Sequence, residues 1–193
     1  MSQKRIVLTG GPGAGKTAVL EIVRIVFGDA VTLLPESASI LFGGGFPRRD
    51  VPVARRAAQR AIYRVQRELE LMAEEEAATP TALCDRGTLD GLAYWPGDVA
   101  EFWAQVGTTH EAELSRYVGV IHLRSPSLHH GYNHKNPVRT ENAEEAARID
   151  ARIYEAWSAH PARIVIESED QFVDKVDAAL HAVRDFLKTN GVT

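Results

Sequence analysis

One segment near the start of the chain combines glycines, a lysine and a threonine at a spacing that suits phosphate binding. Residues 10–17, here called the phosphate loop, read GGPGAGKT and match G-x-x-x-x-G-K-[ST] at every fixed position. Glycines let backbone N–H groups turn inward around a polyphosphate, and the positive end of a following helix points at the same place. The loop therefore predicts a site for a nucleoside triphosphate.

The side chains of the phosphate loop have separate expected roles. Lys16 is expected to bridge the β- and γ-phosphates as a point charge, and Thr17 to offer its hydroxyl to Mg²⁺. The residues expected to contact the nucleotide are Gly11, Pro12, Gly13, Ala14, Gly15, Lys16, Thr17 and Ala18. A chance glycine-rich turn is the alternative, but a strand pattern before the loop and a helix pattern after it disfavour that interpretation.

A second metal ligand is expected from an acid that follows a neighbouring strand. Asp85 stands there, directly after the apolar run Thr81–Cys84 and before Arg86. We expect Asp85 to share Mg²⁺ with Thr17; the alternative is a strand-ending aspartate that caps the next helix. Asp90, five residues on, is a second candidate for this position, but a helix-surface residue is the favoured interpretation.

Glu36 follows the second predicted strand and is the candidate general base. Catalytic groups collect at the carboxyl ends of parallel strands, where a carboxylate can take a proton from an acceptor hydroxyl or orient a water. Glu36 is accordingly also a candidate substrate contact. The alternative is an acid at a helix N-terminus, stabilised there by the helix dipole.

Arginines gather in the segment that we expect to act as a lid, at about residues 124–148. Its cluster comprises Arg124, Lys135, Arg139, Arg148 and Arg152. An arginine supplied from the same chain stabilises the charge that develops in phosphoryl transfer, so Arg139 and Arg148 are candidate catalytic residues. The alternative for the helical arginines is pairing with Glu144 or Glu145.

The lid also carries histidines and an aromatic residue. His129, His130 and His134 match no zinc spacing, so a solvated or substrate-facing loop is favoured over a metal site. Tyr132 is a candidate for stacking on a substrate, with anchoring of the loop as the alternative.

Arginines also recur every four residues at Arg56, Arg60 and Arg64, along one side of a predicted helix. They suit a phosphorylated or acidic acceptor. The alternative is a solvated face, balanced by Glu68 and Glu70.

Alternating apolar strands and amphipathic helices predict a parallel sheet covered on both faces, a three-layer α/β/α architecture. The expected strands are residues 4–9, 30–34, 81–84, 117–123 and 163–166. The expected helices are 16–27, 37–42, 52–78, two short pieces within 89–114, 143–158 and 172–187. With no repeat or linker, residues 1–193 are expected to form a single domain.

Composition excludes several classes of protein. The chain has 193 residues, of which 45% are hydrophobic and 25% charged, an ordinary balance for a globular domain. A net charge of -4 gives no electrostatic case for nucleic acid or an anionic membrane as a partner. No apolar run is long enough for a signal or a membrane span, so a cytoplasmic location is expected. The one cysteine, Cys84, is expected to be a buried, inert thiol.

These residues together resemble a known family, the AAA-type ATPase domain related to nicotinamide riboside kinase. The resemblance covers nearly the whole chain and rests on the phosphate loop, Pro35-Glu36, Cys84–Gly87, Asn136–Arg139, Ile149-Asp150, Trp157 and His160-Pro161. The family is similar to deoxynucleoside and thymidylate kinases. The resemblance implies a P-loop NTPase sheet of five parallel strands in the order 2-3-1-4-5, with a helical lid. It also implies Glu36 as base, an Asp85–Arg86 pair in which Arg86 contacts substrate, and Arg139 and Arg148 in the lid.

The expected function is transfer of a γ-phosphate from ATP, with Mg²⁺, to a small hydroxylated acceptor, including nucleoside-like ones. GTP stays open as the donor, although the chain lacks the Asn-Lys-x-Asp segment of GTPases. The alternative is an ATPase or GTPase switch that acts on a protein partner. A monomer or a homodimer is expected.

Overall fold

The computed structural model describes residues 3–76, 78–125, 143–168 and 171–189. Its centre is a five-stranded sheet with the order β2-β3-β1-β4-β5, and all of its pairings are parallel. The strands are β1 (Lys4–Thr9), β2 (Thr32–Leu34), β3 (Thr81–Asp85), β4 (Gly119–Leu123) and β5 (Arg163–Ile166). The predicted fold class and strand order are confirmed.

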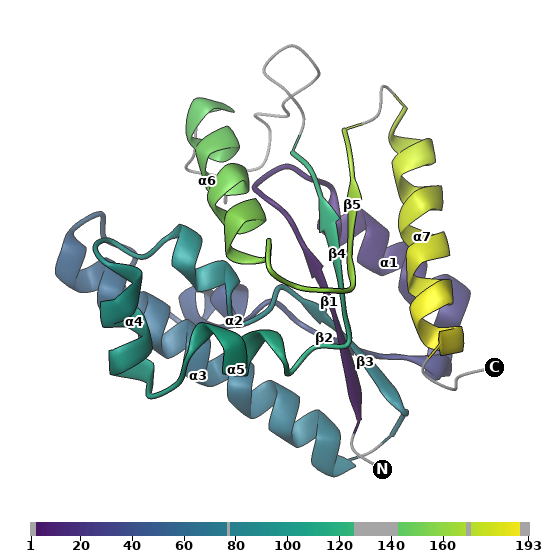
Figure 1. Cartoon of the computed structure of the whole chain (residues 1–193), viewed down its shortest axis with the longest axis horizontal. Helices are drawn as coiled ribbons and strands as arrows, with labels where there is room; N and C mark the ends of the chain where they lie inside the picture. Colours follow the sequence, from purple (N-terminus) through teal and green to yellow (C-terminus); the bar gives the residue numbers. More distant parts are fainter. Residues whose placement is uncertain (1–2, 77, 126–142, 169–170, 190–193) are drawn as a thin grey trace.

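Helices cover both faces of this sheet (Figure 1). One face carries α1 (Lys16–Phe27) and α7 (Phe172–Thr189). The other carries α2 (Ser37–Gly43), α3 (Pro52–Glu76), α4 (Val99–Val106), α5 (His110–Leu114) and α6 (Ala143–Ala156). Two short 3₁₀ turns, η1 (Gly28–Ala30) and η2 (Asp90–Ala93), complete the described elements.

The alternation of β1 side chains explains the three layers. Ile6 and Leu8 are fully buried in the core with α1 and α7, whereas Val7 is buried in the core with α3, α4 and α6. Successive strand residues point to opposite faces, so a wholly apolar strand must be covered twice. Trp157, which follows α6, is fully buried in the second core.

The register of the strands brings the candidate site residues to one edge. Leu8 near the end of β1 pairs with Asp85 at the end of β3, and Thr9 pairs with His122 in β4. The phosphate loop leaves β1 at this edge, and Glu36 follows β2 there. Parallel strands thus gather residues from distant parts of the sequence above their carboxyl ends.

The segment between β3 and β4 is more divided than expected. The sequence predicted two short helical pieces, and the structure has η2, α4 and α5. Asp98 caps α4 by accepting a hydrogen bond from the Ala100 N–H at 2.8 Å, and Gly107 ends it with a φ of 77°. Residues 126–142 of the predicted lid lie outside the described residues. None of the helices that the structure describes is long and apolar enough to cross a membrane.

Candidate functional site

The phosphate loop connects β1 to the N-terminus of α1, as the sequence predicted. Gly13 and Gly15 adopt φ values of 81° and 94°, which favour glycine because it lacks a Cβ. The Lys16 Nζ donates to the carbonyl oxygens of Gly10 at 2.8 Å and Gly11 at 3.2 Å. Burial and the neighbouring Arg86 charge lower the pKa of Lys16 to about 8. The loop therefore holds its lysine folded back on its own backbone.

A cavity of about 580 Å³ extends from the phosphate loop to the space between α2 and α3. Its polar lining includes Lys16, Thr17, Glu36, Asp85 and Arg86. Its other walls include Phe42, Gln59, Ile62, Tyr63, Gln66 and Tyr94. Ligand cavities of this size hold small metabolites, with a few polar groups set among apolar and aromatic walls. The cavity thus joins the five predicted residues of its polar lining to a chamber with several apolar and aromatic walls.

Asp85 lines this cavity, and one of its carboxylate oxygens is buried. Among the described residues, its buried Oδ1 receives no hydrogen bond. Burial and the nearby Glu36 carboxylate raise the pKa of Asp85 to about 6, although Lys16 and Arg86 oppose the shift. A buried carboxylate oxygen without a donor suits a hard divalent cation, and the Thr17 hydroxyl lines the same cavity. The two predicted Mg²⁺ ligands therefore fit such an ion.

Arg86 joins the candidate base to the phosphate loop. Its Nε donates to the Glu36 Oε1 at 2.6 Å, and its Nη1 donates to the Gly10 carbonyl at 3.2 Å. Arg86 has a φ of 70°, rare for a residue with a side chain. Ser39 donates to the other Glu36 oxygen at 2.5 Å. Burial alone would raise the Glu36 pKa, but Arg86, Ser39 and Lys16 together hold it below its ordinary value.

The position of Asp90 differs from the one expected from the sequence, which was a helix surface. The residue is 3% exposed. It accepts hydrogen bonds from Thr9 Oγ1, Arg86 Nη1, the Gly87 N–H and Trp157 Nε1 at 2.5 to 3.1 Å. Asp90 therefore organises the turn that presents Arg86 to Glu36. The helical periodicity could not show this, because η2 contains only four residues.

The structure describes some of the predicted lid arginines and not others. Arg148 is exposed on α6. Arg152 donates to the carbonyl oxygens of Leu92 and Trp95, both at 3.1 Å, so it holds η2 and the chain just after it. Arg139 and Tyr132 lie outside the described residues, and their expected roles stay predictions.

The structure gives Arg56, Arg60 and Arg64 of α3 partners on α4 or in the chain before it. Arg56 donates to the Pro96 carbonyl at 3.2 Å and Arg64 to the Val106 carbonyl at 2.9 Å, while Arg60 donates to the Gln105 side chain at 2.7 Å. They bind α3 to α4 and the chain before it. Glu70, expected on the solvated face, is fully buried.

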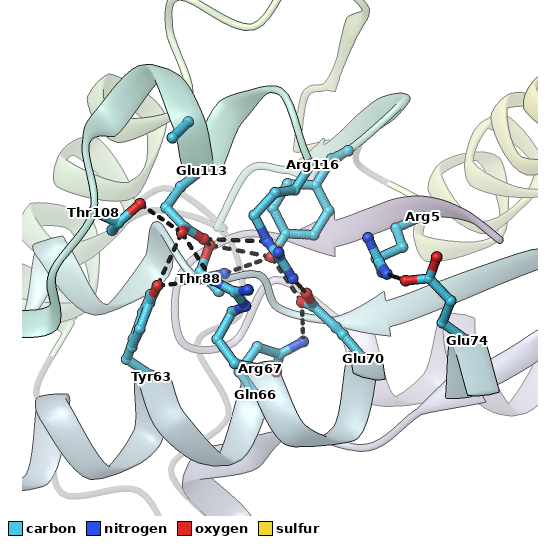
Figure 2. A network of polar contacts seen from close by, with 12 residues as sticks. Arg5, Tyr63, Gln66, Arg67, Glu70, Glu74, Thr88, Thr108, Glu113 and Arg116 are labelled. Carbon is cyan, nitrogen blue, oxygen red and sulfur yellow. Dashed lines mark hydrogen bonds and ion pairs between the residues drawn. The ribbon is translucent and has the colours of Figure 1, made fainter. Parts of the chain in front are cut away.

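Glu70 and Glu113, both buried, instead anchor a polar network (Figure 2). Glu113, from α5, accepts hydrogen bonds from Tyr63 at 2.9 Å and from Thr88 at 2.8 Å. Tyr63 and Thr88 both line the cavity. Glu70 accepts from Tyr117 and Gln66 and pairs with Arg116. Buried acids therefore hold residues of the chamber wall in place, and the hydrophobic pattern of the sequence does not indicate them.

Cys84 is confirmed as a buried cysteine. Burial raises the pKa of its thiol well above the ordinary value, so at neutral pH the thiol stays protonated and unreactive.

Comparisons with known proteins agree with this fold. A family model described as an AAA domain matches residues 5–174. A solved structure described as deoxyadenosine kinase from M. mycoides with bound dATP has a similar fold, with a TM-score of 0.64 at 13% sequence identity. The similarity covers 94% of this chain and 100% of that one. No curated protein matches the sequence.

Proposed function

The chain belongs to the AAA-domain family and has a P-loop kinase-like fold, and on this premise we propose that it is a phosphotransferase. It transfers the γ-phosphate of ATP, with GTP as the other candidate donor, to a hydroxyl of a small metabolite. The acceptor is nucleoside-like, a class that includes nicotinamide riboside.

The observation that carries this proposal is the shape and lining of the cavity. A hydrolase or switch needs room for a triphosphate and a water. Here the space continues past Glu36 into a chamber with Phe42, Ile62, Tyr63 and Tyr94 in its walls. Aromatic and apolar walls beside a few polar groups suit a planar or sugar-bearing molecule. The chamber supports an acceptor site that opens directly onto the phosphate loop.

Each residue of the cavity has a separate role in the proposed phosphoryl transfer. The acceptor hydroxyl oxygen bonds to the γ-phosphorus while the bond from that phosphorus to the β,γ-bridging oxygen breaks, so that a nucleoside diphosphate leaves. Glu36, ionised because Arg86 holds its pKa low, takes the hydroxyl proton. Lys16 leaves the carbonyls of Gly10 and Gly11 to bind phosphate oxygens.

Thr17 and Asp85 would hold Mg²⁺ in this proposal. The ion supplies charge neutralisation for the phosphate oxygens. Arg139 and Arg148 are proposed to close over the phosphates from a lid at about residues 124–148, and Tyr132 and Arg86 to contact the substrate. We further propose a single-domain cytoplasmic protein, monomeric or homodimeric, that does not use nucleic acid or membranes as partners.

An acceptor screen tests the proposed function. ATP or GTP consumption is measured with Mg²⁺ in the presence of nucleosides, nicotinamide riboside and sugars, with product identified by mass spectrometry. We expect an accepted compound to raise nucleotide consumption and to appear in phosphorylated form. Glu36→Gln is expected to lower kcat by about 100-fold or more, because general-base catalysis contributes that much.

Glu21→Gln, an exposed acid on α1, is the matched control and is expected to leave kcat unchanged. Slow nucleotide hydrolysis that no acceptor alters would contradict the proposal and favour a switch that acts on a protein partner. Full activity of the Glu36→Gln variant would remove Glu36 from the role of base.

A further inference from the structure

A buried acid from α6 reaches the phosphate loop from outside the cavity. Asp150 is 3% exposed, and its Oδ1 accepts a hydrogen bond from the backbone N–H of Gly11 at 2.8 Å. The two residues are 139 positions apart in the sequence. Asp150 is not among the residues that line the cavity, so it does not touch the space proposed for the substrates.

Two side chains from β4 and its end hold Asp150 in place. His122 Nε2 lies 3.2 Å from Oδ1, and Arg124 Nε lies 3.2 Å from Oδ2. His122 is fully buried, and its Nδ1 has no partner among the described residues. An N–H on Nε2 can donate to the Asp150 Oδ1 at this distance, so His122 helps to hold the carboxylate in place.

The negative charge of Asp150 is compensated by groups that contact its carboxylate. Burial would raise its pKa, but hydrogen bonds from His122 and the Gly11 N–H, with the Arg124 charge, lower it below the ordinary value. Asp150 is therefore ionised and paired with Arg124. Pairing limits the repulsion that a bare carboxylate would exert on a triphosphate in the adjacent loop.

The approach of Asp150 explains a glycine that phosphate binding does not require. Position 11 is a free position in the G-x-x-x-x-G-K-[ST] pattern. A Cβ on Gly11 would lie 2.6 Å from the Asp150 Cβ and 2.5 Å from the Ser125 Oγ. Ser125 donates to the next carbonyl in the loop, that of Pro12, at 3.0 Å. Ser125, which follows β4, and Asp150 of α6 thus hold the first part of the loop.

From this geometry we propose that Asp150 is a positioning residue for nucleotide binding. By holding the Gly11 N–H, Asp150 orients the peptide groups at the start of the phosphate loop before the nucleotide arrives. The N–H groups further along the loop are then directed at the phosphates without a further ordering cost. Asp150 acts through Gly11 and not on the reacting atoms, and this inference rests on the proposed function only for the presence of a nucleotide.

Calorimetric titration of the full chain with ADP and with Mg²⁺-ATP tests the inference. We expect Asp150→Ala to raise both Kd values roughly tenfold or more, which corresponds to about 1.4 kcal/mol. Asp150→Asn keeps an oxygen that accepts from Gly11, and we expect its Kd values to stay within about threefold of the wild type. Glu155→Ala, an exposed acid on the same helix, is the matched control and is expected to bind normally.

Binding is measured well below the unfolding temperature of each variant, so that lost stability does not count as lost affinity. In steady-state assays the nucleotide KM is expected to rise while the acceptor KM is unchanged, a division that a general loss of stability does not produce. If Asp150→Ala does not fold, Asp150→Ser replaces it, since serine is too short to reach Gly11.

Unchanged nucleotide affinity in Asp150→Ala or Asp150→Ser would overturn the inference. An equal loss in Asp150→Asn would also overturn it, because the charge and not the hydrogen bond to Gly11 would then be the cause. A wild-type chain that binds no nucleotide would overturn the proposed function and this inference with it.

Discussion

At the scale of single residues, Glu36 and Asp85 differ in their partners although they line one cavity. Both are close enough to Lys16 and Arg86 for these charges to act on their pKa values. Glu36 accepts from Arg86 and Ser39, and its pKa falls. The buried Asp85 oxygen has no donor in the part of the chain that the structure describes, and the Asp85 pKa rises to about 6. Partner geometry, rather than residue type, separates a candidate base from a candidate metal ligand.

Asp85→Asn tests this difference through stability. The folded-state pKa of about 6 exceeds the ordinary value of 3.8, so the ionised form costs stability. This destabilisation is absent below about pH 4, where the carboxyl is protonated in both states, and reaches its full size above about pH 6. We expect Asp85→Asn to stabilise the metal-free protein by roughly 1–3 kcal/mol at pH 7 and not at pH 4, measured by urea unfolding. The same variant is expected to lose the Mg²⁺ dependence of nucleotide affinity.

Asp29→Asn, an exposed aspartate in η1, serves as the control and is expected to change stability at neither pH. Destabilisation of the metal-free protein by Asp85→Asn at pH 7 would show that Asp85 has a favourable partner, contrary to the geometry.

At the scale of elements, glycine at the start of β4 sets how closely α7 packs on the sheet. A Cβ on Gly119 would lie 2.3 Å from the Phe186 ring, and Phe186 belongs to α7. The sequence predicted both elements from their periodicity, but not the contact between them. The helix–sheet distance depends on this pair of residues because the core is close-packed.

Gly119→Ala is therefore expected to destabilise the protein by about 1–3 kcal/mol, as overpacked cores do. In a Phe186→Ala background the same change is expected to cost much less, because the ring that the new methyl meets has gone. Chemical denaturation of the four proteins in the cycle measures the coupling. Strictly additive effects would contradict the close approach of β4 and α7.

At the scale of the whole molecule, buried acids join elements that form the chamber wall. Glu113 of α5 accepts from Tyr63 of α3 and from Thr88 after β3, and it pairs with Arg67 and Arg116 (Figure 2). The Glu113 side chain is 1% exposed. Removal of Glu113 leaves the buried hydroxyl groups of Tyr63 and Thr88 without the acceptor to which they donate, which costs more than the net worth of any one contact.

Glu113→Ala is expected to lower the free energy of unfolding by about 3–5 kcal/mol. Glu111→Ala, an exposed acid on the same helix, is expected to change it by less than about 0.5 kcal/mol. Equilibrium denaturation at neutral pH makes the comparison. Similar stabilities of the two variants would show that the network does not support the chamber.

The sequence alone determined the features that depend on residues close together in the chain. The phosphate loop is one continuous pattern, and the strands and most helices follow from hydrophobic periodicity, so these predictions were confirmed in type and order. The position of Asp85 after a strand was also predictable, because parallel strands bring their carboxyl ends to one edge. The resemblance to a kinase-related family supplied the strand order.

Only the tertiary structure decided which distant side chains meet. Arg86 contacts Glu36 across 50 positions, and Asp150 contacts Gly11 across 139. Periodicity reports which face of an element is apolar, and a polar residue that is buried through its partners gives no such signal. For this reason Asp90 was placed on a helix surface, and Asp150, named only as part of the family resemblance, was given no role. The phosphate loop was evident from the sequence, whereas the groups that hold it in position became visible only when the chain was folded.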